Sequence, residues 1–109
     1  MGARAQVLIK DEGVYLYTHC GAGEIEEDVK RALAKKWRWD VPEYLARIIF
    51  EEMIPEGERM DETGFGIGNA EHGDIDRLVT VNCAEQKVTV KDIYEDSERS
   101  FSFEDFIKA

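Results

Sequence analysis

Apolar and polar residues alternate along two short segments near the start of the chain, residues 5–10 and 14–20. In the second segment, one set of alternate positions carries Val14, Leu16, Thr18 and Cys20, and the other carries Tyr15, Tyr17 and His19. A period of two residues is typical of a β-strand, and Asp11-Glu12-Gly13 is a suitable turn between the two segments. The pattern therefore predicts a β-hairpin. In it, His19 and Cys20 lie on opposite faces of the sheet and cannot act together as a nucleophile and its base.

The next segment has the period of a helix. Apolar residues recur at every fourth position and predict one buried stripe, which consists of Ile25, Val29, Leu33 and Trp37. Acidic residues cluster around the first turn, and Lys35, Lys36 and Arg38 follow at the end, which matches the charge preference of a helix dipole. We expect a helix that begins after the glycine turn at 21–23 and has a solvated basic face.

A second helix is predicted to begin near Asp40. Asp40 is a suitable N-cap, Pro42 fits the first turn, and Glu43 completes a pattern that resembles a capping box. Trp39 and Tyr44 have the spacing of a hydrophobic staple across that start. The expected buried face consists of Leu45, Ile48, Ile49 and Met53, and the helix is expected to end at residues 54–57.

The second half of the chain has a less regular pattern. Residues 63–68 predict a short strand closely packed by another backbone, because glycines alternate with Phe65 and Ile67. Residues 78–81 and 88–90 are β-rich and predict a second hairpin around a turn at 84–86. We expect residues 92–100 to form a polar, acidic linker. Ser102 then caps a final helical turn, and the side chains expected to dock onto the core are Phe101, Phe103, Phe106 and Ile107.

This order, β-β-α-α-β-β-β followed by a short C-terminal helix, predicts a single α+β domain over residues 1–109. We expect two layers, in which two helices cover one face of a mainly antiparallel sheet of about five strands. If Val14 and Leu16 face the helices, then Tyr15, Tyr17 and His19 lie on the other face. An aromatic surface there is solvated, covered by the C-terminal segment, or used to bind something.

Composition narrows the class of protein. Of the 109 residues, 43% are hydrophobic and 35% are charged, which is apolar enough for one folded core. No apolar run approaches the roughly 18 residues of a membrane span, and the N-terminal residues lack the apolar centre of a signal peptide. We therefore expect a cytoplasmic protein that has no membrane partner.

The net charge of −10 lies entirely in the second half of the chain. Residues 1–50 contain eight basic and eight acidic residues, whereas residues 51–109 contain six and sixteen. Binding to nucleic acid depends on basic groups that neutralise phosphates. We therefore expect no nucleic-acid partner.

No known cofactor or metal motif is present in the sequence. Residues 71–76, Glu-His-Gly-Asp-Ile-Asp, lack the spacing of a calcium loop or a zinc helix, so we predict a solvated acidic turn and no metal. Neither residues 21–23 nor residues 64–68 have the features of a phosphate-binding loop, and we expect no cofactor. Cys20 and Cys83 belong to no Cys-x-x-Cys pattern and are expected to be small buried thiols.

Four motifs follow one another along the chain. They are Met1-Gly2-Ala3-Arg4-Ala5, Tyr15-Leu16-Tyr17-Thr18-His19, Arg38-Trp39-Asp40 with Tyr44-Leu45-Ala46-Arg47-Ile48-Ile49-Phe50, and Thr63-Gly64-Phe65-Gly66-Ile67. Together they resemble a family of small uncharacterised proteins found in bacteria, archaea and phages, and the resemblance implies no activity. In that family Tyr-Thr-His is usually followed by Trp. The departure at Cys20 argues against this cysteine as an essential nucleophile.

Three functions remain open. The first is a non-catalytic binding or assembly module that meets a protein partner or a second copy through Tyr15, Tyr17 and His19, since tyrosines bury a large area and keep a polar tip. The second is a small hydrolase or transferase in which His19 is the general base, near Thr18, Arg4 or the 63–76 loop. The third is an acidic decoy or regulator of a protein that has a basic surface.

We expect the binding module ahead of any enzyme. The side chains expected to form its binding surface are Arg4, Tyr15, Tyr17, His19, Thr63 and Phe65.

Overall fold

A computed structural model describes residues 3–59 and 64–109, and it confirms the α+β class. The elements in chain order are β1 (Ala5–Ile9), β2 (Val14–Thr18), α1 (Ile25–Ala34), α2 (Pro42–Met53), the 3-10 helix η1 (Glu56–Glu58), β3 (Phe65–Gly68), β4 (Arg77–Asn82), β5 (Lys87–Asp92), β6 (Ser97–Ser102) and α3 (Phe103–Lys108). Within these two ranges, no helix has both the length and the apolar character that crossing a bilayer requires.

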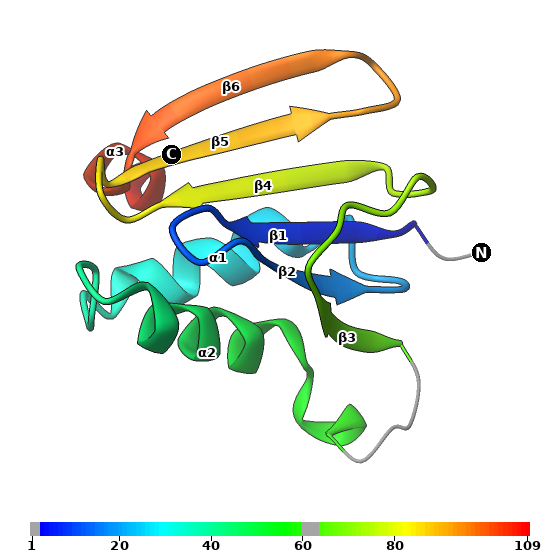
Figure 1. Cartoon of the computed structure of the whole chain (residues 1–109), viewed down its shortest axis with the longest axis horizontal. Coiled ribbons are helices and arrows are strands. Elements are labelled where there is room, and N and C mark those ends of the chain that lie inside the picture. The colour runs from blue at the N-terminus through cyan, green and yellow to red at the C-terminus, as the bar shows by residue number, and fades with distance from the viewer. Residues whose placement is uncertain (1–2, 60–63) are drawn as a thin grey trace.

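The strands form one sheet in the order β3-β2-β1-β4-β5-β6 (Figure 1). Neighbouring strands are antiparallel except β1 and β4, which pair in parallel at the centre. After the β1–β2 hairpin, the chain forms the helices, adds β3 to the outer edge of β2, and then crosses over to the far side of β1. A parallel pair needs such a crossover connection.

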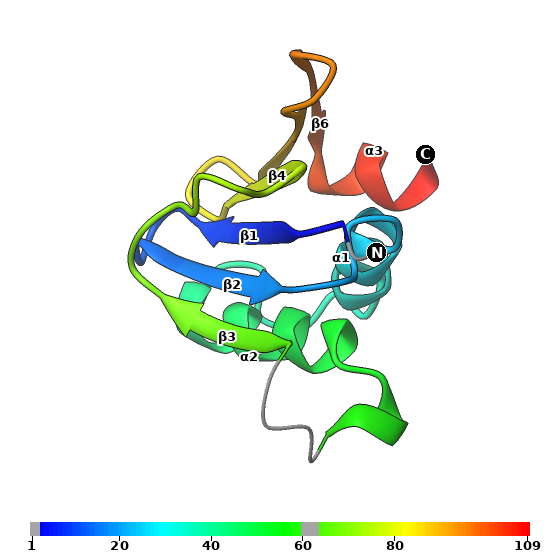
Figure 2. The same ribbon diagram turned by 90° about the vertical axis from the view of Figure 1, so that its right-hand side faces the viewer.

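The core lies between one face of the sheet and the helices, which all lie on the same side (Figure 2). Alternation holds along the central strands, where the buried side chains include Ala5, Val7, Ile9, Leu16, Val79, Val81, Val88 and Val90. The predicted face of the second helix is confirmed, since Leu45, Ile48, Ile49 and Met53 are buried. Two-residue and helical periodicity therefore identify most of the core.

The predicted stripe on α1 is wrong at its last member. Ile25, Val29 and Leu33 are buried, but α1 ends at Ala34 and Trp37 is 58% exposed. Lys36 and Arg38 both have φ of 59°, a left-handed conformation that costs roughly 1–2 kcal/mol for a residue that has a Cβ. The backbone therefore leaves the helical path before Trp37, which points outward.

The start of α2 also differs from the prediction. The N-cap is Val41 instead of Asp40, and its side chain makes no capping bond, while Pro42 lies in the first turn as expected. Tyr44 is 47% exposed, so no hydrophobic staple is formed with Trp39. Trp39 instead donates its indole N–H to the Leu33 carbonyl at 3.0 Å and packs edge-on against Phe103.

Residues 92–100 do not form a linker, which makes six strands instead of about five. Ser97–Ser102 is β6 and pairs along its whole length with β5, joined by a turn in which Asp96 has φ of 54°. The strand is polar because it lies at the edge, where Phe101 is the only residue that packs on the core, opposite Val88. An exposed edge strand needs no apolar alternation, so its sequence resembles a linker.

The predicted C-terminal helical turn is confirmed as α3. Ser102 is its N-cap, and the Ser102 hydroxyl accepts the Asp105 N–H at 3.0 Å. Phe103 and Phe106 are buried in the core. Since α3 packs beside α1 (Figure 2), the C-terminal segment does not cover the sheet face that carries the tyrosines.

Candidate functional site

Tyr17 lies at the centre of a polar cluster on the sheet face away from the helices. Its hydroxyl is 3.5 Å from Nδ1 of His19, and its ring stacks on that of His72 with centroids 4.5 Å apart. Arg4 reaches the same cluster, where its Nε lies 3.4 Å from a carboxylate oxygen of Asp74. The structure therefore brings three of the predicted binding residues, Arg4, Tyr17 and His19, close to a loop that lies far from them in the sequence and carries His72 and Asp74.

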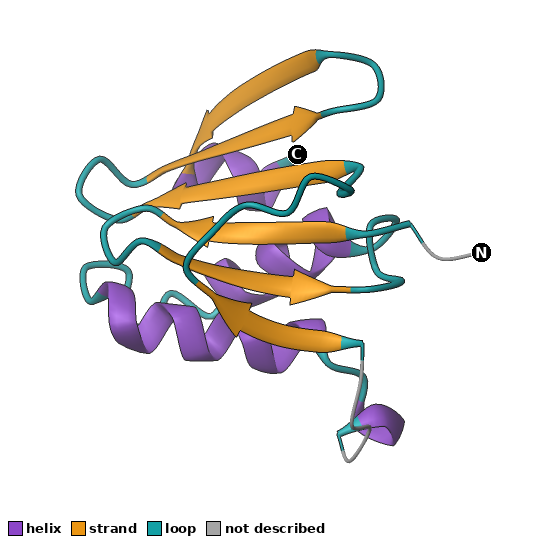
Figure 3. Ribbon diagram, turned by 45° about the vertical axis from the view of Figure 1, so that its right-hand side comes forward, coloured by secondary structure: helices purple, strands orange, loops and turns teal. Residues whose placement is uncertain are grey.

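The segment between β3 and β4, residues 69–76, runs across this face above β2 and β1 (Figure 3). We call it the crossover. Gln6 of β1 is 1% exposed beneath it; its amide donates to the Ala70 carbonyl at 3.3 Å and accepts the His72 N–H at 2.9 Å. The crossover thus covers part of the face around Tyr17, while Tyr15 and His19 lie outside these contacts.

Within residues 3–59 and 64–109, the contact described for the His19 side chain is with neither a nucleophile nor a carboxylate. Its side chain is exposed, and the neighbouring Thr18 is buried on the helix side of β2. β2 ends at Thr18, although the His19 N–H still bonds to the Gly64 carbonyl at 2.7 Å. The contact of the imidazole is with the Tyr17 hydroxyl.

The two cysteines differ in environment, and the prediction that both are buried is wrong for one. Cys20 is exposed, whereas Cys83 is buried. Burial, aided by the negative charge of Asp11, raises the pKa of Cys83 to about 11. Asp11 itself accepts the N–H groups of Cys83 and Ala84 at 2.7 and 3.0 Å, so it holds the turn that follows β4.

The acidic segment 71–76 forms contacts within the protein. Asp74 pairs with Arg4, and its other oxygen lies 3.9 Å from Nδ1 of His72. In the part of the chain that the structure describes, no three His, Cys, Asp or Glu side chains gather as metal ligands would.

The glycine turn at residues 21–23 is closely packed. A Cβ on Gly21 would lie 2.7 Å from the Thr18 hydroxyl, so close packing requires a glycine there.

The remaining predicted residues lie elsewhere. Phe65 pairs with Thr18 in the ladder, and it therefore faces the helices instead of the tyrosines. Thr63 lies outside the described residues. The prediction that another backbone packs closely on β3 is wrong, because a Cβ added at Gly66 or Gly68 would meet nothing within 4 Å.

A groove between β3 and α2 was not predicted from the sequence. It has a volume of about 280 Å³, and its lining consists of Val14, Leu16, Ala46, Phe50 and Ile67, with Glu12, Glu43 and Arg47 at the rim. Ile67 is 65% exposed, the most exposed isoleucine or leucine on the described surface. An apolar groove beside an exposed isoleucine is a candidate site for an apolar ligand.

Along the outer edge of β3, next to this groove, backbone groups have no hydrogen-bond partner within residues 3–59 and 64–109. The His19–Gly64 bond fixes the phase of the antiparallel ladder, in which hydrogen-bonded pairs alternate with non-bonded pairs. By that alternation Gly66 and Gly68 bond to Tyr17 and Tyr15, while the N–H and C=O groups of Phe65 and Ile67 point away from the sheet. This edge can accept another strand.

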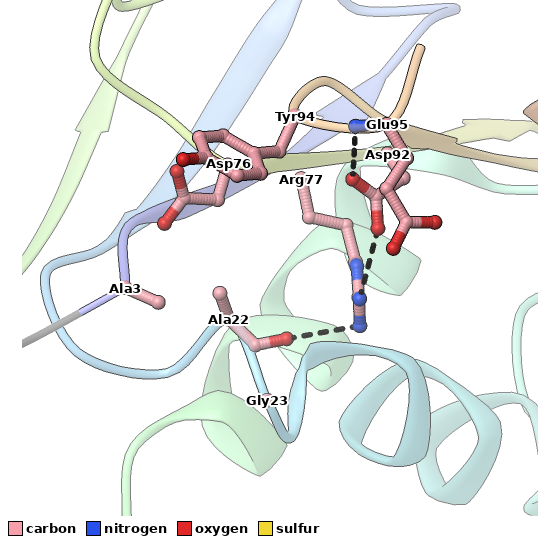
Figure 4. Close-up of a pocket in the computed structure, with 8 residues that line it drawn as sticks. All are labelled: Ala3, Ala22, Gly23, Asp76, Arg77, Asp92, Tyr94 and Glu95. Carbon is pink, nitrogen blue, oxygen red and sulfur yellow. Dashed lines mark hydrogen bonds and ion pairs between the residues drawn. The ribbon is translucent and has the colours of Figure 1, made fainter. Parts of the chain in front are cut away.

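A second cavity, of about 340 Å³, lies where α1 begins and β5 ends (Figure 4). Arg77 forms its floor, donates to the Ala22 carbonyl at 3.3 Å, and pairs with Glu26 and Asp92 at 3.3 Å each. The pKa of Asp92 is lowered by the hydrogen bond from the Glu95 N–H and by Arg77. These contacts satisfy the Arg77 guanidinium. They also link β4, which carries Arg77, to β5 and to the start of α1.

Comparisons of the chain with models of protein families, with curated proteins and with solved structures found no match. The resemblance of its motifs to a family of small bacterial, archaeal and phage proteins stays a prediction.

Proposed function

We propose that the protein is a non-catalytic binding module that takes up an extended segment of a partner protein as an additional strand along β3. Main-chain hydrogen bonds to the edge supply affinity in this mode of recognition, and side chains at alternate positions supply specificity. The observation that carries the proposal is the exposure of Ile67, at 65%, on an edge strand that borders an apolar groove.

β3 is only four residues long, but it has none of the charged residues or prolines that protect many sheet edges. Such edges carry charged residues, prolines or bulges that prevent a further strand from pairing. β6, the opposite edge, has Glu98 and Arg99, whereas β3 consists of two glycines, Phe65 and Ile67. An edge of this composition favours pairing with another chain.

The groove provides a place for the side chains of the added segment. Ile67 and Phe65 lie on the helix side of β3, so every second side chain of a neighbouring strand would lie above the groove. α2 forms its far wall through Ala46 and Phe50. Burial of an apolar side chain there contributes about 1.5–3 kcal/mol.

The other side of the added strand would face the tyrosines. Gly66 and Gly68 stand opposite Tyr17 and Tyr15 and have no side chains that would separate them from a further strand. A long side chain of the partner can therefore reach across β3 towards Tyr15, which is half-buried. A segment bound along β3 would therefore also contact the sheet face that carries Tyr15 and Tyr17.

The two alternatives have less support. A hydrolase would need a nucleophile or a carboxylate beside His19, and the contact described for its ring is with Tyr17. A decoy would present its carboxylates as free groups, and some of them instead pair with cations of the same chain, namely Glu26, Glu51, Glu52, Asp74 and Asp92.

The test is a binding experiment on edge variants. A display library of random twelve-residue peptides is selected on the wild-type protein, and affinities of the enriched peptides are measured by calorimetry. Ile67→Pro removes the outward N–H without breaking the ladder to β2, because that N–H does not pair within the sheet. We expect it to weaken binding at least tenfold.

Ile67→Val is the matched control, since it keeps the backbone donor and a β-branched apolar side chain. We expect its affinity to stay within about threefold of the wild-type value, a loss typical of one methyl group. Circular dichroism checks that both variants fold. Enriched peptides that bind Ile67→Pro as tightly as wild type would contradict strand addition.

A further inference from the structure

The turn between α1 and α2 carries a second exposed surface that strand addition does not use. We call it the α1–α2 corner and define it as residues 35–44. The same turn packs the partly buried Trp39 against the core, with its indole N–H donating to the Leu33 carbonyl, and exposes Trp37. Both residues that flank Trp37, Lys36 and Arg38, adopt the left-handed conformation with φ of 59°. Residues held in this region often mark binding sites.

Trp37 lies between two hollows of the surface. One, of about 330 Å³, is lined by Trp37, Arg38, Tyr44, Arg47 and Ile48. The other, of about 400 Å³, lies on the far side of Trp37 and includes Lys35, Glu51 and Glu52. Exposed Trp, Tyr and Arg side chains together are the composition of an interface hot spot.

Residues 35–44 contain three basic residues, Lys35, Lys36 and Arg38, against Asp40 and Glu43, which gives a net charge of +1 on a protein whose net charge is −10. The Arg38 guanidinium lies 4.6 Å from the centroid of the Tyr44 ring, and within residues 3–59 and 64–109 no carboxylate pairs with it. Lys36 has one loose partner, Glu104 at 3.7 Å, and both of these side chains are more than half exposed. Arg38 is therefore the cation available to an incoming anion.

The neighbouring cations have partners already. Lys35 pairs with Glu52 at 3.3 Å, and Arg47 pairs with Glu51. These carboxylates line the larger hollow, so a chain of phosphates that extended into it from Arg38 would meet repulsion. The surface suits a single carboxylate beside an apolar group better than it suits a polyanion.

We infer that the α1–α2 corner docks a short acidic segment of a partner protein. An aromatic or leucine side chain of that segment enters the hollow between Trp37 and Tyr44, and an adjacent carboxylate pairs with Arg38. The corner includes neither β3 nor Ile67, although Arg47 of α2 lines both its hollow and the groove beside β3.

The experiment uses the two tryptophans, of which only Trp37 is exposed. The probes are capped six-residue peptides that alternate Glu with Phe or Leu. Titration into the full-length wild-type protein is expected to shift tryptophan emission to shorter wavelength and to saturate. Calorimetry is expected to show at least tenfold weaker binding for Arg38→Gln. Peptides that have Ala in place of Phe and Leu are expected to bind at least tenfold more weakly.

The matched control is Lys87→Gln, which removes the same charge from an exposed position on β5. We expect it to change affinity less than twofold, and we expect the same of Ile67→Pro. Equal losses for Arg38→Gln and Lys87→Gln would overturn the proposal, because they would indicate net charge alone. Equal binding of peptides that have Lys in place of Glu, tighter binding of ten-residue oligo-dT, or the absence of a saturable response would overturn it too.

Discussion

Gln6 connects the crossover to the sheet. It is the largest fully buried polar side chain in the described core, and both ends of its amide bond to the crossover backbone. A buried amide is tolerated only when its hydrogen bonds are made. Gln6 therefore helps to hold residues 69–76 against the sheet, together with the bond from the Asp76 N–H to the Arg4 carbonyl, and with them the ring of His72 that stacks on Tyr17.

Gln6→Ala is expected to destabilise the fold by about 1–3 kcal/mol, because it removes two partly buried hydrogen bonds, one to the Ala70 carbonyl and one from the His72 N–H. Urea denaturation measures the change. Lys91→Ala, on the same face of the neighbouring hairpin but exposed, is the control and is expected to change the free energy of unfolding by less than about 0.5 kcal/mol. An equal effect of both substitutions would show that Gln6 does not hold the crossover.

The thiols are expected to react at very different rates. Cys20 is exposed, and Cys83 is buried and has a pKa of about 11. Because the thiolate is the reactive form, a thiol reagent at pH 8 is expected to modify Cys20 quickly and Cys83 only after denaturation. Mass spectrometry after timed alkylation counts the modified thiols. Two labels at equal rates in the native protein would contradict the burial of Cys83.

The pKa of Cys83 also predicts how stability depends on pH. It is raised from 9.0 to about 11, so the unfolded thiol ionises before the folded one. The contribution of this group is fully present below pH 9 and is lost as the pH rises towards 11. Cys83→Ala is expected to flatten the fall in unfolding free energy over that interval, and denaturant titrations at pH 8 to 11 measure it.

At the scale of elements, β6 and α3 act as one unit. β6 lies at the edge of the sheet, and Ser102 ends it and caps α3 at the same residue. Phe103 and Phe106 then insert into the core. The cap therefore fixes the point at which the chain turns from β6 into α3, and so it helps to position the Phe103 and Phe106 side chains.

Ser102→Ala is expected to cost about 1 kcal/mol, because the Asp105 N–H loses the hydroxyl that accepts it. Ser97→Ala, on the same strand and exposed, is the control and is expected to be neutral. Thermal and urea unfolding of the two variants give the comparison. Equal stabilities would mean that the cap contributes nothing to the position of α3.

Periodicity identified the elements that are buried on one face. β1, β2, β4, β5 and the buried faces of α1 and α2 follow from the alternation or the helical spacing of their apolar residues. β6 was not predicted as a strand, because only one of its side chains, Phe101, packs on the core. The end of α1 was not predicted, because the left-handed conformation of Lys36 and Arg38 has no signature in the sequence.

At the scale of the whole molecule, the site depends on long-range pairings. The tyrosine face was predictable from alternation within β2 alone. The groove was not, because it requires β3 to pair with β2 and α2 to lie below both, and neither contact is encoded in local spacing. The crossover was not predictable either, since the parallel pairing of β1 and β4 determines its path.

The two edges of the sheet differ in their capacity to pair with a further strand. β6 is charged and unsuited to further pairing, whereas β3 is apolar and next to the groove. Strand addition is therefore expected at one edge only. A second copy would have to pair through β3 as well, which would make a closed dimer instead of a filament.

Amide hydrogen exchange at β3, measured by NMR with and without a selected peptide, tests the account most directly. In the free protein, Gly66 and Gly68 are expected to be protected by their bonds to β2, while Phe65 and Ile67 exchange freely. Saturating peptide is expected to slow exchange at Phe65 and Ile67 at least tenfold. A peptide that binds and leaves both of these amides exchanging at their free rates would contradict strand addition at β3.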